Sequence, residues 1–570
     1  MGGDALTSAV TSAEVGGDAL TSAVTPVTPA SRPGAFGWAF EDAPVGRCFA
    51  CGQPCHTLGP DRRPVHPVCW DKQPSTPAEL GEQLELAADD AGEEDQAVTA
   101  TEDPRPAPRP EPRPGPRDPA ALDAAGLHLP DGRVLPVADR STGAAIAAAA
   151  AGAGVRDVWL HPEVTRALGL EPARLQAQAT GSPWLAPAGE WHPTQDRLTG
   201  MVVYRRGQEH EVTRLHVVAP ASRLGSLAGA RDGAELLRLV LRFEALTGAR
   251  WDGSASQTTV HLRRTLARGA RGVSPGSYDP AELLPAPLAR GVARAPSWYR
   301  PLPPEEAERY PSVVLVDQRA NYLAVLDSEL GAKAPQHVPG PVELAALPRA
   351  GWARVRAGAW PDPQTFDPLG ALRRRADDAG AFWAELHLLR YAAGAAVPVE
   401  VLEAWCFPAA RRFLAPVKAR LREVLYALED GPEAEREALR PLVKAMYAEF
   451  VGWLGSAEYH DPGDPLWRPD WHDAILGNAA VVTHRKARKA PGRVAAVRTD
   501  ALGVLMERDD PAEAAALLGG RLGERLGQYK AEGSWPSALH VLEPDAAGDP
   551  DGATLEIRRR VRDWQRGGDR

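Results

Sequence analysis

The hydrophobic and polar positions of the chain begin to form a regular pattern near Ala120, where short apolar runs and amphipathic segments alternate. The turn dipeptide Asp131-Gly132 between two apolar runs predicts a hairpin. The alanine-rich segment 143–152 predicts a helix, and apolar runs at 158–160 and within 200–219 predict strands. Residues 233–247 have apolar positions at helical spacing, and Gly248 directly after them indicates a helix end.

The second half of the chain continues this alternation. Residues 313–316 form a continuous apolar run, which is typical of a buried strand. We expect further elements as follows: helices over 379–393, 408–429, 433–455 and 470–490, and strands over 397–406 and 494–497. Because strands and helices mix throughout, the expected fold class is α/β or α+β.

The length of 570 residues is too great for one core, so two to four folded units are expected. The formal charge of −10 comes from one place, since the stretch from Glu79 to Asp103 has ten acidic residues and no Lys or Arg. The rest of the chain is near neutral, so the net charge does not exclude a nucleic-acid partner. Because no long apolar segment or signal peptide is visible, we expect a soluble, cytoplasmic protein with no membrane partner.

Four of the five cysteines lie in one short stretch. Cys48-x2-Cys51 and His66-x2-Cys69 are two pairs of soft ligands with the spacing of a tetrahedral zinc site. The segment is too short to bury a core, so structural Zn²⁺ would supply its folding energy. Cys55 and His56 could replace one of the four ligands, and the alternative is a metal-free loop with reduced thiols.

Two aspartates follow directly after apolar strands: Asp317 in VVLVDQRANYL and Asp500 in VAAVRTDALGVL. Carboxylates fixed at the ends of adjacent strands can converge on a pair of Mg²⁺ ions, as two-metal phosphoryl transfer requires. Lys444 begins the string KAMYAEFVG on an expected helix, where its ammonium group can neutralise a triphosphate. In an unrelated α/β domain, the same residues would be strand caps and a solvated lysine.

These strings resemble the motifs of family B DNA polymerases. Asp317 and Tyr322 match motif A, Lys444 and Gly452 match motif B, and Thr499-Asp500 matches motif C. The resemblance covers about 305–545 and implies the palm and fingers of the compact, protein-primed type found in plasmids, phages and integrative elements. It implies Asp317 and Asp500 as ligands of Mg²⁺ or Mn²⁺.

The resemblance also assigns nucleotide-binding roles. Tyr322 would lie under the sugar of the nucleotide and exclude ribose, while Lys444, with Arg420 on the preceding helix, would bind triphosphate. Two departures from the motifs weigh against catalysis. Arg498 replaces the first aspartate of motif C, where its guanidinium group would oppose cation binding, and Ala448, Glu449 and Val451 replace the Asn, Ser and Tyr of motif B.

The stretch 485–493 contains five cations with no acid between them. It is either a phosphate-binding surface or a solvated helix end. The candidate DNA-contacting residues are Arg485, Lys486, Arg488 and Lys489.

The expected organisation follows from these segments. It comprises a disordered repeat at 1–43, a zinc module at 44–72, and an acidic and then Pro/Arg-rich linker at 73–119. An α/β domain is expected at 120–304. It is RNase H-like or related, and its candidate strands have none of the acidic residues that a nuclease site needs. A palm/fingers-like domain at 305–545 and a tail at 546–570 follow.

The expected function is templated nucleotidyl transfer on DNA with dNTPs. The alternative is a catalytically inactive DNA-binding or replication-accessory protein of a mobile element, with a protein partner for the zinc module. A zinc-containing transcriptional regulator is a third hypothesis.

Overall fold

The computed structural model describes two units of the chain, Met1–Glu111 and Pro112–Arg570. The described residues are 39–40, 46–47, 54–55, 57–58, 118–168, 191–195, 201–206, 212–220, 222, 224–267, 275–460, 464, 466–543 and 550–568. In the first unit, β1 (Ala39–Phe40) pairs with β4 (Thr57–Leu58), and β2 (Gly46–Arg47) pairs with β3 (Pro54–Cys55). The expected zinc ligands Cys48, Cys51, His66 and Cys69 lie outside the described residues.

The second unit begins with a seven-stranded sheet in the order β7-β6-β5-β8-β11-β10-β9. Its strands are β5 (Pro119–Leu122), β6 (Leu127–His128), β7 (Val134–Leu135), β8 (Asp157–Leu160), β9 (Trp191–Gln195), β10 (Met201–Arg206) and β11 (Val212–Val217). The strands β5, β8 and β11 run parallel, and the remaining pairs are antiparallel. The hairpin at Asp131-Gly132 and the strand pair within 200–219 are confirmed.

Helices follow these strands where the sequence predicts them. α3 (Gly143–Gly152) and α6 (Gly233–Thr247) have the predicted bounds, and α4 (Pro162–Ala167) is a further short helix. The ends of α6 are fixed locally. Asp232 accepts a hydrogen bond from the Glu235 amide, and Gly248 adopts φ +70° after the last turn.

Four helices share one hydrophobic core. They are α6, α7 (Ala255–Ala267), α14 (Ala415–Glu429) and α15 (Glu433–Gly455), and the first half of the helix Pro469–Ala487 also contributes to this core. The hydroxyl of Thr259 on α7 donates a 2.7 Å hydrogen bond to the carbonyl of Met446 on α15. The predicted helix at 433–455 is confirmed. The predicted helix at 408–429 begins only at Ala415, because 409–411 form a strand instead.

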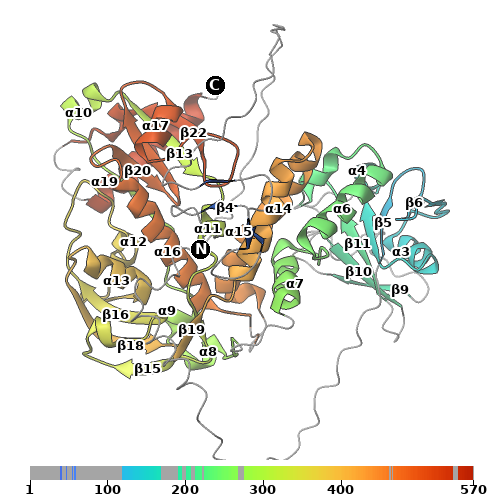
Figure 1. The fold of residues 1–570 in the computed structure, drawn as a ribbon, viewed down its shortest axis with the longest axis horizontal. Coiled ribbons are helices and arrows are strands. Elements are labelled where there is room, and N and C mark those ends of the chain that lie inside the picture. Colours follow the sequence, from blue (N-terminus) through green and yellow to red (C-terminus); the bar gives the residue numbers. More distant parts are fainter. Residues whose placement is uncertain are drawn as a thin grey trace, which may run out of the picture. The chain divides into compact units, whose positions relative to one another are not determined.

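The sheet that contains both predicted aspartates has five antiparallel strands in the order β12-β20-β21-β13-β22. These are β12 (Ser297–Tyr299), β13 (Ser312–Gln318), β20 (Val494–Arg498), β21 (Ala501–Met506) and β22 (Tyr529–Pro536). Figure 1 shows the yellow-green strand β13 among the red strands β20 and β22, which follow much later in the sequence. The five-stranded sheet is therefore assembled from distant segments of the chain.

A four-stranded antiparallel sheet lies between β13 and α14 in the sequence, in the order β15-β18-β16-β17. Its strands are β15 (Gln336–Pro339), β16 (Gly351–Ala357), β17 (Phe382–Glu385) and β18 (Val399–Cys406). The helix predicted over 379–393 is therefore wrong in its first half. Residues 382–385 pair with β16, and α13 (Leu386–Gly394) starts where Glu385 accepts a hydrogen bond from the Leu388 amide.

A long helix, α16 (Pro469–Ala487), and a C-terminal helix, α19 (Pro550–Gly568), complete the main framework. The segment expected to be a tail thus contains a helix, and its Ile557 and Val561 are buried in a core with Trp535. The smaller elements are α8 (Pro280–Leu283), α9 (Ala286–Ala289), α10 (Pro304–Arg309), α11 (Asn321–Val325), α12 (Gly370–Arg373), α17 (Pro511–Leu517), β14 (Leu330–Ala332), β19 (Ala409–Arg411) and the 3₁₀ turns Gly225–Gly229, Leu344–Ala346, Ala457–Tyr459 and Ser537–His540.

The architecture confirms the mixed α/β class. None of the helices in the described part is long and apolar enough to cross a membrane. The expected boundary near 304 falls inside the second unit and stays a prediction.

Candidate active site

Strand pairing brings the two predicted aspartates together. Asp317 on β13 lies opposite Ala501 on β21, and Asp500 directly precedes Ala501 in the two-residue turn between β20 and β21. Directly paired residues of antiparallel strands have Cα atoms about 4.5–5.5 Å apart. The tight turn requires φ +62° at Thr499. Asp500 is therefore held beside Asp317 by backbone geometry.

Both carboxylates open into one cavity of about 260 Å³. Its walls come from the end of β13 and the start of α11, from α14 and α15, from the β20–β21 turn, and from β22 and the segment before it. The lining residues are Asp317, Gln318, Arg319, Ala320, Asn321, Tyr322, Leu425, Arg440, Lys444, Tyr447, Ala448, Asp500, Leu526, Lys530 and Glu532. Four predicted site residues thus meet: Asp317, Tyr322, Lys444 and Asp500.

The carboxylates disfavour each other's charge. Burial and the neighbouring Asp317 raise the pKa of Asp500 to about 7, and Lys486 opposes this rise. Burial also raises the pKa of Asp317, while Lys530 partly offsets the effect. Among the described residues, Oδ1 of Asp317 is buried and has no hydrogen-bond partner. The pair therefore has unmet capacity for positive charge.

The ammonium group of Lys530 supplies part of this positive charge. Nζ of Lys530 on β22 lies 3.1 Å from Oδ2 of Asp317 and 2.5 Å from Oε1 of Glu532. Burial works against the ammonium charge, but the hydrogen bond to Glu532 and the attraction of Asp317 raise the pKa of Lys530. Lys530 and Glu532 belong to the string LGQYKAE, whose local pattern does not show that Lys530 contacts Asp317.

The helix α15 presents one polar face to the cavity. Arg440, Lys444 and Tyr447 line the cavity at positions i, i+4 and i+7, which share one face of a helix. Arg440 donates a 2.7 Å hydrogen bond to the carbonyl of Glu524, which fixes its direction. Prediction from motifs missed Arg440 and Tyr447, although their helical spacing from Lys444 could have revealed them.

Lys486 differs most from its predicted role as an exposed DNA contact. It is 8% exposed, and its Nζ is 2.9 Å from Oδ1 of Asn321. Burial lowers its pKa to about 8, against the pull of Asp500 and Asp317. This correction has a simple reason: successive residues of a helix face different sides, and Lys486 points inward while Arg485, Arg488 and Lys489 are exposed.

Two other predicted nucleotide-binding residues lie outside the cavity lining. Arg420 on α14 is half-buried and pairs with Glu423 at 3.5 Å on its own helix. Gly452 is exposed, two turns beyond Lys444 on α15. The sequence places each on the right helix but cannot show which face of the helix turns toward the carboxylates.

Arg498 was expected to oppose cation binding. Its side chain is exposed, it does not line the cavity, and the main electrostatic influences on Asp500 come from Asp317, Lys486 and Glu532. Arg498 instead influences Tyr299. Burial raises the pKa of Tyr299, and the positive charge of Arg498 opposes this rise. The expectation that Arg498 would repel a metal ion is therefore not supported by its position.

The cavity suits a divalent cation that is shared with a phosphorylated ligand. Among the described residues, no cluster of three or more His, Cys, Asp or Glu is arranged to hold a metal ion by itself. Mg²⁺ commonly binds through one or two carboxylates together with substrate phosphates and water. Two adjacent carboxylates, one with an orphaned buried oxygen, fit that requirement.

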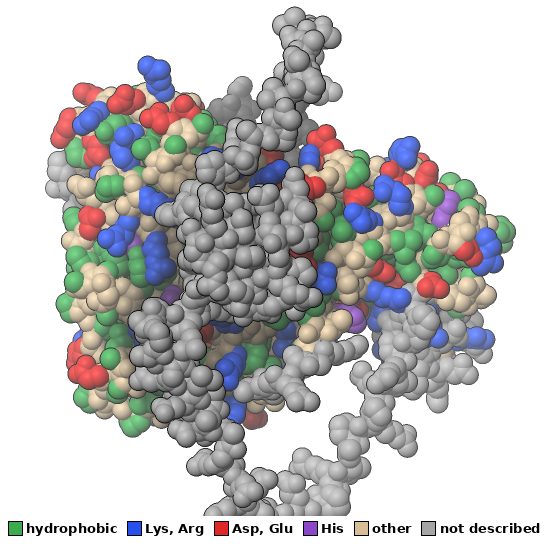
Figure 2. Space-filling model, viewed as in Figure 1, with side chains coloured by type: hydrophobic (Ala, Val, Ile, Leu, Met, Phe, Trp, Pro, Cys, Tyr) green, Lys and Arg blue, Asp and Glu red, His purple; other side chains and the backbone are tan. Residues whose placement is uncertain are grey.

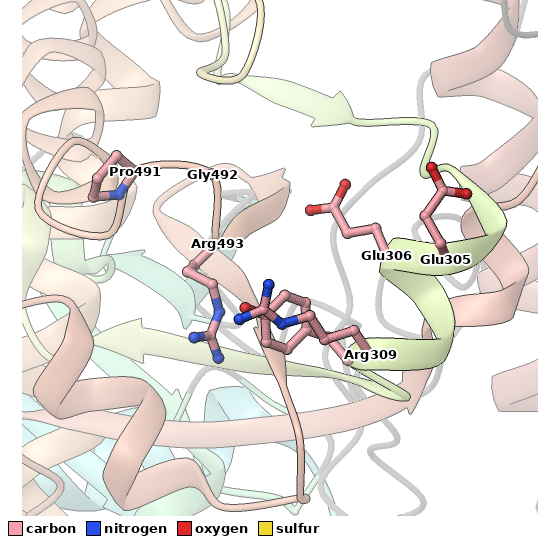
Figure 3. Close-up of a pocket in the computed structure, with 7 residues that line it drawn as sticks. Glu305, Glu306, Arg309, Pro491, Gly492 and Arg493 are labelled. Atoms are coloured by element: carbon pink, nitrogen blue, oxygen red, sulfur yellow. The ribbon is translucent and has the colours of Figure 1, made fainter.

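The end of the basic stretch lines a second cavity, of about 320 Å³, between α10 and the turn before β20. In Figure 3, Arg309 and Arg493 approach each other from these two segments. Both guanidinium groups lie over the Tyr310 ring, with centroid distances of 5.1 and 4.1 Å. Glu306 is paired with Arg300 at 2.8 Å. Because these groups already have partners, the geometry there indicates packing.

A strand-end aspartate of the seven-stranded sheet is likewise fully engaged. Asp123 follows β5 and accepts hydrogen bonds from the amides of Ala125, Gly126 and Gly233, at 2.8, 3.1 and 2.8 Å. Nε2 of His128 lies 2.9 Å from its Oδ2. Burial alone would raise the pKa of Asp123, but these bonds outweigh burial and lower it.

Among solved structures, the chain has partial similarity to DNA polymerases, with TM-scores below 0.5. A complex of phi29 DNA polymerase with primer-template DNA and incoming nucleotide substrates has 12% identity and a TM-score of 0.47, covering 74% of this chain and 85% of that chain. A complex with primer-template DNA has 11% identity, the same coverage and a TM-score of 0.46.

The family B DNA polymerase from the archaeon Pyrobaculum calidifontis has 15% identity and a TM-score of 0.29, covering 75% of this chain and 58% of that one. No protein-family model and no curated protein matches the sequence.

Proposed function

We propose that this chain is a divergent DNA polymerase-like enzyme that performs templated nucleotidyl transfer. One observation supports the proposal above all: Asp317, Asp500, Tyr322 and Lys444 line a single cavity although they come from distant parts of the sequence. In the proposed reaction, the 3′-hydroxyl oxygen of a primer bonds to the α-phosphorus of a dNTP, and the bond to pyrophosphate breaks.

Asp317 and Asp500 would hold Mg²⁺ or Mn²⁺ in this site. The bound cation neutralises phosphate charge and favours ionisation of the attacking hydroxyl. Asp500 must be ionised for this role, and its raised pKa of about 7 makes ionisation incomplete near neutral pH. Binding of the cation to the free carboxylates should therefore strengthen as the pH rises through 7.

The remaining cavity residues suit a nucleotide. Lys444 and Arg440 lie one helical turn apart and can neutralise the β- and γ-phosphates as charge builds on the leaving group. Tyr322 is half-buried at the start of α11 and would limit space beside the sugar. The exposed cations Arg485, Arg488 and Lys489 would contact DNA phosphates.

Lys486 and Asn321 would position this site without touching the reacting atoms. Their 2.9 Å hydrogen bond ties the end of α16 to the start of α11. The lysine also places a buried positive charge near Asp500 and Asp317.

The alternative function is an inactive DNA-binding or replication-accessory protein of a plasmid, phage or integrative element. One observation favours it, namely the ammonium of Lys530 at 3.1 Å from Asp317, where it stands in for a metal ion. Primer extension by the full-length protein with Mg²⁺ or Mn²⁺ and four dNTPs distinguishes the two functions. Extension that falls at least about 10³-fold in Asp500→Asn supports the enzyme, whereas DNA binding without extension by the wild type supports the accessory role.

We also propose that Cys48, Cys51, His66 and Cys69 bind one structural Zn²⁺, in a module that contacts DNA or a protein partner. The support is the spacing of the two ligand pairs. Elemental analysis of the purified chain should give one zinc per molecule, which Cys51→Ser/Cys69→Ser should lose. An equal zinc content in this variant would contradict the assignment.

A further inference from the structure

A third cavity, of about 530 Å³, is lined by four arginines. Arg290 and Arg294 follow α9, Arg354 lies on β16, and Arg375 follows α12. Trp383 on β17 pairs directly with Arg354 across the four-stranded sheet and also lines the cavity. Four separate segments thus bring positive charge and the aromatic residues Phe382 and Trp383 to the same cavity.

Most of this charge is unneutralised. Arg354 pairs with Asp377 and with Glu403, the latter at 3.4 Å. Within the described part of the chain, the other three arginines form no ion pair, and Arg290 and Arg294 bond only to backbone carbonyls. Burial and the neighbouring Arg375 lower the pKa of Arg294, and the carboxylate of Asp473 only partly opposes this effect.

A buried carboxylate fixes the loop that contains Arg290 and Arg294. The carboxylate of Asp473 on α16, fully buried, accepts hydrogen bonds from the amides of Val292 and Ala293 at 2.8 and 3.0 Å. It also accepts one from the indole of Trp352 at 2.9 Å. A rigid support lowers the entropy that the arginines would lose on binding a ligand.

The arginine cavity is separate from the candidate active site. The two cavities share no lining residue. The helix α16 connects them, because Asp473 supports the arginine loop while Lys486 reaches Asn321. These two positions are about 20 Å apart along the helix axis, at 1.5 Å per residue. A single mononucleotide bound at the carboxylates therefore does not occupy the arginine cavity.

We propose that this arginine cavity binds the phosphate backbone of a single-stranded nucleic acid. Guanidinium groups grip phosphate oxygens with two parallel hydrogen bonds, and an aromatic ring beside them can stack on a base. On the face drawn in Figure 2, Lys/Arg and Asp/Glu side chains are interspersed. A concave site with four arginines and one lining carboxylate differs from such a mixed surface. The inference does not depend on catalysis by Asp317 and Asp500.

The test is binding of a fluorescent 5′-labelled single-stranded oligonucleotide, about 20 nucleotides long, to the full-length protein without divalent metal or dNTP. Arg290→Gln/Arg375→Gln should weaken binding roughly tenfold and make the salt dependence of the affinity shallower by about 1.4, since each lost phosphate contact accounts for about 0.7. The matched control is Arg558→Gln/Arg562→Gln, which removes two exposed arginines of α19 and should change affinity less than about twofold.

An effect no larger than that of the control would overturn the proposal. If the double variant loses its folded far-ultraviolet circular dichroism, Arg375→Gln alone is measured, because no hydrogen bond of this side chain to the described residues would be lost. That variant should weaken binding by about threefold. Inorganic tripolyphosphate is the second probe. The arginine substitutions could weaken tripolyphosphate binding and leave oligonucleotide binding unchanged. That result would show that the cavity binds a free nucleotide and not a nucleic-acid strand.

Discussion

Two sheets of this molecule each have an aspartate at the end of a strand, and the hydrogen bonding and pKa of the two aspartates differ in opposite directions. Asp123 accepts three backbone hydrogen bonds beside His128, and its pKa is lowered. Asp317 has one buried oxygen without a partner, and its pKa is raised. Asp123 therefore stabilises the turn after β5 and the start of α6, while burial disfavours the charged forms of Asp317 and Asp500, and Asp317 further disfavours that of Asp500. Strand-end position is similar in both sheets, so hydrogen-bond satisfaction separates the structural carboxylate from the one that we propose binds a cation.

The difference between the two aspartates should have its largest effect on the free energy of unfolding. Asp123→Asn should lower the free energy of unfolding by about 2–3 kcal/mol, because a carboxylate that accepts several amide bonds is replaced by a single acceptor oxygen. Asp317→Asn should cause no loss, because it removes a carboxylate whose ionisation is disfavoured. Urea unfolding of the two variants at pH 7.5 measures both values. Equal losses would mean that both aspartates are structural.

The pH dependence of Asp500 sharpens the comparison. Its folded pKa is raised to about 7, above its ordinary value of 3.8. Below pH 3.8 both folded and unfolded chains are protonated there, so the group has no effect on stability. Between these values the unfolded chain ionises first, and stability falls until the pH passes 7.

Asp500→Asn should therefore raise the unfolding midpoint relative to the wild type at pH 8, by roughly 2–4 °C, and the difference should vanish near pH 4. Thermal unfolding monitored by circular dichroism at both pH values measures this. Mn²⁺ at pH 8 should stabilise the wild type but not the variant. A gap of the same size at both pH values would show that Asp500 is not held in its disfavoured charged state.

The smallest expected effect is on cation affinity and concerns Lys530, whose ammonium group forms an ion pair with Oδ2 of Asp317. Lys530→Met should tighten Mn²⁺ binding at pH 8 by roughly two- to fivefold, the worth of a partly exposed ion pair. Calorimetric titration measures the affinity, and Lys333→Met, which removes an exposed lysine elsewhere, is the control. Weaker Mn²⁺ binding in Lys530→Met would indicate that the ammonium helps to order the carboxylates.

Much of the fold could be read from local signals. The bounds of α3 and α6 follow from alanine content, amphipathic spacing, the Asp232 cap and Gly248, and α15 follows from its periodicity. These elements were predictable because their determinants lie within a few residues. The strand β17 was missed because its extended form depends on pairing with β16, which the local sequence does not contain.

The candidate site was only partly predictable. The strings around Asp317, Tyr322, Lys444 and Asp500 singled out four residues that line one cavity. The sequence could not show that Arg420 turns outward or that Lys486 turns inward, since both lie on helices with cations on several faces.

By itself, the sequence determined which chemical groups the chain can offer and where most strands and helices begin and end, because residue type and short-range spacing decide these. Only the tertiary structure decided which groups meet. Register between β13, β21 and β22 sets Asp317 beside Asp500 and Lys530, and four separate segments converge to form the arginine cavity. Such contacts join residues that are far apart in the chain, so packing and strand register, rather than local pattern, decide which of these charged groups lie together.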